Sequence, residues 1–145
     1  MEKIKFDSGM RSYRIGEGGV LRFNPADPNL YARFMACGEK LQAMEKELME
    51  KAKALPEEEL AGLQLLEEAD RQLKGMLSWV FGAHNNFEEI LGGVSLLATA
   101  ENGERVIVNL LSALQPIMEK GAKSCAQEEA QKAVQKARSR RENKV

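Results

Sequence analysis

The sequence predicts a mainly α-helical protein with a small β-meander at its N-terminal end, followed by a long antiparallel helical hairpin and further C-terminal helices. Three observations support this prediction. Charged residues make up 30% of the 145 positions and aromatic residues only 6%, a profile that suits long helices better than a β-sandwich. Apolar residues recur every three or four positions from residue 28 onward, which is the spacing of one helix face. Only the first 23 residues alternate with the period of a strand.

The expected strands lie within residues 1–23. Pairs of apolar residues two positions apart occur three times, at Ile4 and Phe6, Tyr13 and Ile15, and Leu21 and Phe23. The segments DSG at 7–9 and GEGG at 16–19 separate these pairs and suit tight turns. We therefore predict a meander of two or three strands. Such a small sheet needs another element to cover its apolar face.

A structural joint is expected between this meander and the first helix. Asn24 and Asp27 carry side chains that can cap a helix, and Pro25 and Pro28 fix φ near the helical value. Asp27 and Pro28 form the better pair of N-cap and first helical residue. Phe23 and Phe34 are expected to pack the sheet against the helices. The whole candidate joint consists of Phe23, Asn24, Pro25, Asp27, Pro28 and Phe34.

Residues 28–81 predict two long helices that pair as a hairpin. The first is expected over 28–54, and the second begins at Pro56 and runs to about Phe81. The short break at Leu55-Pro56 predicts antiparallel neighbours. In the second helix we expect one seam to face the partner, formed by Leu63, Leu66, Asp70, Leu73, Leu77 and Val80. Asp70 interrupts this seam, so it should either lie at the edge or help to set the register.

The C-terminal part divides at Gly121. Asn86 and Glu89 have the spacing of a capping box for a short helix, and apolar residues from Ile107 onward predict a third major helix. Beyond Gly121 the apolar pattern thins to a stripe of alanines. We therefore predict one domain over 1–121 and a charged, helical or partly disordered tail over 122–145.

The residues that carry chemistry are few. His84 is the only histidine, and neither Cys37 nor Cys125 has a second cysteine or a histidine at metal-ligand spacing. We expect no catalytic residues, no metal and no cofactor, and a protein that is not an enzyme. No apolar segment has the length of a membrane span or the character of a secretion signal, so the cytoplasm is the expected compartment.

Charge is distributed unevenly along the chain, although the formal net charge is only −1. Residues 39–70 contain ten acidic and four basic residues, whereas residues 132–145 contain six basic residues and one acidic residue. Such a bipolar layout suits self-association or a charged partner. The balanced total charge argues against a nucleic-acid binder, but the basic tail keeps that alternative open.

Candidate partner-binding residues come from two places. The aromatic candidates are Trp79, Phe81 and Phe87, which can equally close the core around the end of the second helix. The basic candidates are Lys132, Lys136, Arg138, Arg140 and Arg141. The tail that carries them can be a solvated helix end, a nucleic-acid arm, or a helix that docks in a groove through its alanine stripe.

Three segments of the chain together resemble a known protein family. They are VLRFNPADPNLYARF, FGAHNNFEEILGG and NLLSALQPIMEKG. This combination resembles the tail assembly chaperones of long-tailed phages and prophages of Gram-positive bacteria, over about Lys3 to Gly121. The most specific part of the resemblance is Phe23-Asn24-Pro25 with Asp27-Pro28 and Arg33-Phe34.

The resemblance implies a non-enzymatic function during phage assembly in the host cytoplasm. Proteins of this family coat the helical tape measure protein, keep it soluble, and recruit tail tube subunits that displace the chaperone, so we expect the protein to be absent from the mature virion. Two other functions remain open on the residues alone. One is a helical regulator that sequesters a compact partner, and the other is a small nucleic-acid-binding regulator that uses the basic tail.

Overall fold

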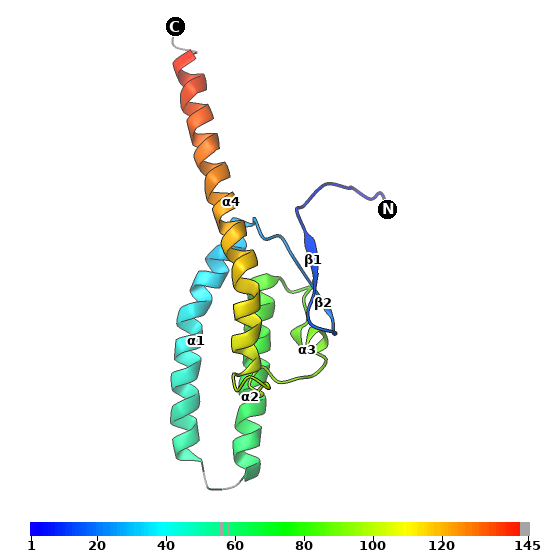
Figure 1. Ribbon diagram of the computed structural model, residues 1–145, viewed down its shortest axis with the longest axis vertical. Coiled ribbons are helices and arrows are strands. Elements are labelled where there is room, and N and C mark those ends of the chain that lie inside the picture. The colour runs from blue at the N-terminus through cyan, green and yellow to red at the C-terminus, as the bar shows by residue number, and fades with distance from the viewer. Residues whose placement is uncertain (56, 58, 143–145) are drawn as a thin grey trace.

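The computed structural model describes residues 1–55, 57 and 59–142. In chain order the elements are β1 (Arg11–Arg14), β2 (Val20–Phe23), α1 (Pro28–Ala54), α2 (Glu59–Phe81), α3 (Phe87–Ile90) and α4 (Val106–Glu142). The hairpin α1–α2 stands beside α4, and the strands lie with α3 on the other side of α2 (Figure 1). The prediction of a mainly helical fold with an N-terminal hairpin of strands is confirmed.

Two of the possible three strands form within the described residues. β1 and β2 pair antiparallel, with Tyr13 opposite Leu21. At their turn the N–H of Gly19 donates to the carbonyl of Ile90 in α3 at 3.0 Å. A Cβ on Gly19 would lie 2.7 Å from the Cα of Ile90, so the close approach of turn and helix requires glycine. The segment of Ile4 and Phe6 does not join the sheet.

The helices of the hairpin begin and end almost where the sequence predicts. The Asp27 carboxylate accepts a hydrogen bond from the N–H of Asn29 at 2.9 Å, and Pro28 is the first residue of α1. α1 ends at Ala54, and α2 ends at Phe81 before Gly82, whose φ is +118°. The predicted place of Pro56 as a first helical residue lies outside the described residues.

The hairpin has two unlike halves. We call residues 28–40 of α1 and 70–81 of α2 the proximal half, and residues 41–54 and 59–69 the distal half. All the buried residues of α1 and α2 lie in the proximal half: Leu30, Cys37, Asp70, Leu73, Lys74, Met76, Leu77, Val80 and Phe81. The protein core is therefore built at one end of the hairpin.

The proximal core is closed by the sheet and by α3. Phe23 of β2 stacks on Tyr13 with ring centroids 5.0 Å apart and meets Phe81 edge to face at 5.1 Å. Phe81 in turn lies 6.0 Å from Phe87 of α3. These contacts supply the covering layer that the small sheet needs.

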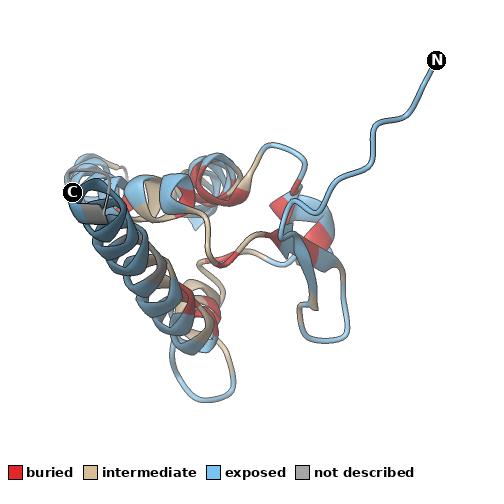
Figure 2. Ribbon diagram, turned by 90° about the horizontal axis from the view of Figure 1, so that it is seen from above, coloured by how far each residue is buried: buried red, intermediate tan, exposed pale blue. Residues whose placement is uncertain are grey.

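The helix α4 covers the proximal half and then continues beyond it. Leu110, Leu114 and Met118 are buried against the hairpin. The helix passes through Gly121 without a break, and every side chain described between Ala126 and Arg141 is exposed. The last turns of α4 project past the end of the hairpin at which α1 begins, and they carry no buried residue in Figure 2. We call residues 122–142 the α4 extension.

Candidate protein-interaction surfaces

The candidate joint connects the sheet, α1 and α4. Asn24 folds the chain locally, because its side-chain oxygen accepts from the N–H of Ala26 at 2.8 Å and its amide donates to the carbonyl of Ser8 at 3.0 Å. Phe23 is buried, and Phe34 is half-buried against the core. These contacts support the interpretation of this segment as a structural joint.

Tyr31 and Gly121 bring α4 onto the joint. The hydroxyl of Tyr31 lies 2.6 Å from the carbonyl oxygens of both Pro25 and Met118, and its single proton can be donated to one of them at a time. Burial raises the pKa of Tyr31, which keeps the hydroxyl protonated. Gly121 lies so close that an added Cβ would overlap the Pro25 carbonyl oxygen and the Tyr31 hydroxyl. Glycine at 121 is therefore what allows α4 to pass the joint.

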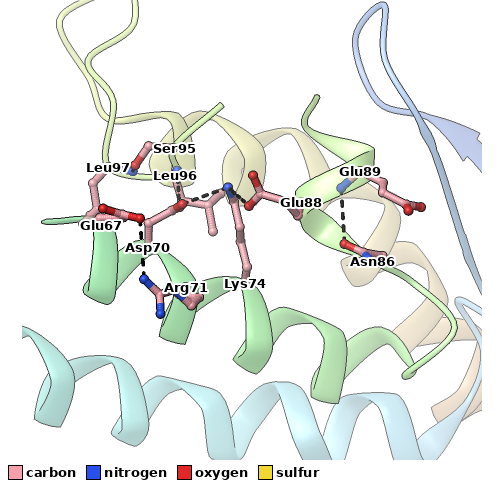
Figure 3. Close-up of polar contacts among 10 residues, drawn as sticks. All are labelled: Glu67, Asp70, Arg71, Lys74, Asn86, Glu88, Glu89, Ser95, Leu96 and Leu97. Atoms are coloured by element: carbon pink, nitrogen blue, oxygen red, sulfur yellow. Dashed lines mark hydrogen bonds and ion pairs between the residues drawn. The ribbon is translucent and has the colours of Figure 1, made fainter. Parts of the chain in front are cut away.

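An ion cluster formed by the buried residues Asp70 and Lys74 and the exposed Glu88 ties α2 to the segment after it (Figure 3). The ammonium group of Lys74 lies 2.8 Å from a carboxylate oxygen of Asp70 and 2.6 Å from one of Glu88. Burial by itself lowers the pKa of Lys74, but its hydrogen bonds to the two carboxylates outweigh this effect and leave the pKa raised. The stability that the raised pKa of Lys74 contributes is thus present at neutral pH and is lost as the pH rises through that raised pKa.

Asp70 also determines where α4 begins. Its second carboxylate oxygen accepts from the N–H of Leu96 at 2.7 Å, and the carbonyl of Leu96 accepts from the N–H of Ile107 in the first turn of α4 at 2.9 Å. Leu96 is completely buried. Of the two possibilities for Asp70, the structure supports a role in register, since this residue is buried and fixes the start of α4 against α2.

The aromatic partner-binding candidates separate into core and surface. Phe81 and Phe87 are 3% and 1% exposed and belong to the core, which supports the alternative interpretation of core closure for both. Trp79 is 44% exposed. The ammonium group of Lys40 lies 3.7 Å from the centre of its ring, a cation–π contact that partly covers the indole. Of the three, Trp79 alone remains available to a partner.

The distal half of the hairpin contains an open apolar groove of about 440 Å³ between α1 and α2. We call it the distal groove. Its apolar wall includes Leu41, Met44, Leu48, Leu65, Leu73 and Ile107. Its charged residues are Glu45, Glu47, Glu68, Lys51 and Arg105. Neither basic group is free of contacts, because Lys51 lies 3.2 Å from Glu47 and Arg105 donates to the carbonyl of Leu97 at 2.6 Å.

A row of exposed leucines lies on the distal half of α2. Leu60, Leu63 and Leu66 are 64%, 63% and 37% exposed, and we call them the leucine stripe. The predicted seam is buried from Asp70 onward, whereas its first two members, Leu63 and Leu66, are exposed. A repeat of seven residues drifts by about 20° per heptad around a straight helix. Leu65 and Ala69 line the groove, while Leu63 and Leu66 line the adjoining hollow toward the tip together with Leu48 and Met49 of α1.

The basic candidates all lie on the α4 extension. Lys132, Lys136, Arg138, Arg140 and Arg141 are exposed, and none of them belongs to an ion pair found among the described residues. Val134, on the same segment, is 50% exposed. The extension therefore presents basic and small apolar side chains to its surroundings.

Cys37 and His84, a cysteine and a histidine that carry reactive groups, both contact other parts of the fold. Cys37 is buried, and burial raises the pKa of its thiol. His84 is exposed, with Nε2 2.8 Å from the carbonyl oxygen of Arg22. Within the described ranges, no three His, Cys, Asp or Glu side chains come together as a possible metal site.

The chain matches no protein-family model, no curated protein and no solved structure. Among the helices of the described residues, none is both long enough and apolar enough to cross a membrane.

Proposed function

We propose that this protein is a phage tail assembly chaperone that binds and solubilises the tape measure protein and helps to recruit tail tube subunits. The observation that carries the proposal is the leucine stripe. Three large apolar side chains stand exposed on a long helix, while the core lies at the other end of the hairpin. The resemblance in sequence supplies the identity of the helical client.

The leucine stripe suits a helical client for a physical reason. Leucines spaced by three residues on one helix pack against an amphipathic partner helix in the manner of a helical bundle. The contact is small, so each copy binds weakly, and a long helical client would be covered by many copies. Weak individual binding also allows tube subunits to displace the chaperone, which an obligate interface would resist.

Co-expression with the proposed client, the tape measure protein, tests the proposal. The complex is analysed by size-exclusion chromatography with light scattering. We expect the otherwise insoluble client to become soluble in a complex that contains many copies of this chain. A one-to-one complex with a compact protein would instead support a regulator. A client that stays insoluble would overturn the chaperone proposal, and a salt titration with nucleic acid would follow.

Variants of the stripe locate the contact. The double substitution Leu60→Ser with Leu63→Ser removes two exposed side chains, so the fold should survive while client solubilisation is lost. Val94→Ser is the matched control, since Val94 is 49% exposed and lies outside the hairpin. Unchanged solubilisation by the double variant would exclude the stripe as the binding surface.

A further inference from the structure

The distal groove and the α4 extension have complementary properties, although they lie at opposite ends of the molecule (Figure 1). The groove is an apolar space between α1 and α2 whose lining includes Ile107 and Val108 of the first turn of α4, whereas every side chain described between Ala126 and Arg141 of the extension is exposed. In the proximal half Leu110, Leu114 and Met118 of α4 are buried in the same core cluster as residues of α1 and α2. Along the distal half, α4 contributes Ile107 and Val108 of its first turn to the groove lining. We propose that, in the free protein, the α4 extension of one copy occupies the distal groove of a second copy.

Charge favours this occupant. The groove and the adjoining hollow toward the tip are lined by five acidic residues, Glu45, Glu47, Glu57, Glu59 and Glu68, against Lys51 and Arg105. Lys51 is already paired with Glu47. The extension carries five exposed basic side chains over residues 132–141. The opposite charges of the two surfaces attract the extension of one copy to the groove of the next. Like charges disfavour contacts of extension with extension or of groove with groove.

The dimensions also agree. At 1.5 Å per residue the 21 residues of the extension span about 31 Å, and residues 41–54 of α1 span about 21 Å. The extension is thus long enough to cover the groove with its basic turns beside the acidic wall. Its alanines at 126, 130, 133 and 137 lie on one face, where small side chains let helices approach closely, and Val134 adds a larger apolar group.

The type of assembly follows from the two surfaces being different. A contact between unlike surfaces is heterologous, so repetition gives an open chain of copies or a closed ring. The hollow beside the groove is lined in part by Leu63 and Leu66, so an extension that reaches it would cover part of the leucine stripe, whereas Leu60 lies outside both linings. The inference goes beyond the proposed function and does not depend on the client.

Light scattering on the purified full-length chain, treated with nuclease, tests the inference. The weight-average mass should exceed that of the 16.1 kDa monomer, increase with protein concentration, and fall when salt is raised. The tail variant, Lys132→Glu and Lys136→Glu with Arg140→Glu, leaves two basic and three acidic residues over 132–141. This variant and the groove variant, Glu45→Lys with Glu68→Lys, should each associate more weakly by roughly tenfold or more. Lys3→Glu with Lys5→Glu is the matched control in the N-terminal segment and should associate like the unaltered chain.

Mixing the two variants gives the decisive result. In the tail variant the extension and the groove are both acidic. In the groove variant the extension and the groove are both basic. Each should be monomeric alone, and the mixture should associate, because every extension then meets a groove of opposite charge. Circular dichroism checks that both variants fold. Three results would overturn the inference. The unaltered chain could be monomeric at all concentrations, its association could be unchanged by both sets of substitutions, or the mixture of the two variants could stay monomeric.

Failure of this test is distinguishable from failure of the proposed function. A monomeric chain that still solubilises its client would refute self-docking and leave the chaperone function in place. A chain that associates through the groove but leaves the client insoluble would support self-docking and refute the chaperone function. Association that disappears after nuclease treatment would show that nucleic acid joins the copies, and it would also overturn self-docking.

Discussion

The proximal and distal halves of the α1–α2 hairpin have the same two helices and opposite environments. In the proximal half the helices are covered by α4, by the aromatic side chains of the sheet and by α3, and Leu77 and Val80 are almost completely buried. In the distal half, leucines of the same seam are exposed and a groove separates the helices. The comparison shows that the buried core lies at one end of the hairpin and that the apolar side chains at the other end are largely exposed.

The largest expected difference between the halves concerns large apolar side chains. Phe87→Ala should lower the free energy of unfolding by about 3–5 kcal/mol, because it opens a cavity in the core that closes the proximal half. Leu63→Ala in the distal half should change it by no more than about 0.5 kcal/mol, since the side chain is 63% exposed. Urea unfolding measures both. If the two variants lost similar amounts of unfolding free energy, the proximal and distal halves would contribute equally to stability, contrary to this prediction.

The ion cluster marks the boundary between the halves and gives the next largest effect. Asp70→Ala leaves the buried ammonium of Lys74 with one carboxylate and the N–H of Leu96 with none, so we expect a loss of about 3 kcal/mol. Glu67→Ala is the control, because the exposed pair of Glu67 and Arg71 at 3.6 Å is worth about 0.3–0.5 kcal/mol. Thermal unfolding at neutral pH compares them. Equal effects would mean that Asp70 does not anchor α4.

Two glycines should respond in opposite directions to the same substitution. Gly121→Ala should destabilise the protein by about 1–3 kcal/mol, because the added methyl group overlaps the joint. Gly75→Ala should stabilise it by about 0.5–1 kcal/mol, since no atom lies within 4 Å of the added Cβ and alanine favours the helix. Denaturant unfolding gives both values. A stabilising Gly121→Ala would show that α4 does not press on the joint.

The smallest expected effect belongs to the N-cap of α1. Asp27→Ala should cost about 1 kcal/mol through the lost hydrogen bond to Asn29. Client solubilisation after refolding should be unchanged, because the joint lies far from the distal half. Loss of solubilisation at full stability would instead make the joint a contact site. Glu39→Ala, at an exposed position of α1, is the control for removal of a negative charge.

The parts of the fold that are determined by residues close together in the sequence could be predicted from it. Asp27 with Pro28 determines the start of α1, and Asn86 caps α3 by accepting from the N–H of Glu89 at 3.2 Å, as the capping box predicts. The strand expected at Ile4 and Phe6 did not form, although the alternation is regular. A strand forms only where its backbone pairs with a neighbouring strand in register, and the apolar period alone carries no information about that pairing.

The division into two halves could not be predicted, for a related reason. The apolar pattern is equally regular in both halves, so it does not tell which turns α4 covers. That depends on the contact of Asp70 with Leu96, which joins residues 26 positions apart and is absent from any local pattern. Leu60 and Leu65 are apolar and lie outside the seam, which signals that apolar side chains occupy more than one face of the distal half of α2.

Backbone hydrogen exchange of the dilute, monomeric protein tests the difference between the halves most directly. Amides of 28–40, 70–81 and 106–118 should exchange only by global unfolding, whereas those of 41–54 and 59–69 should exchange faster through local opening. Mass spectrometry of peptides from the two halves reports both rates in one experiment. Faster exchange confined to the distal half is the expected result. Equal protection along the whole hairpin would contradict the account.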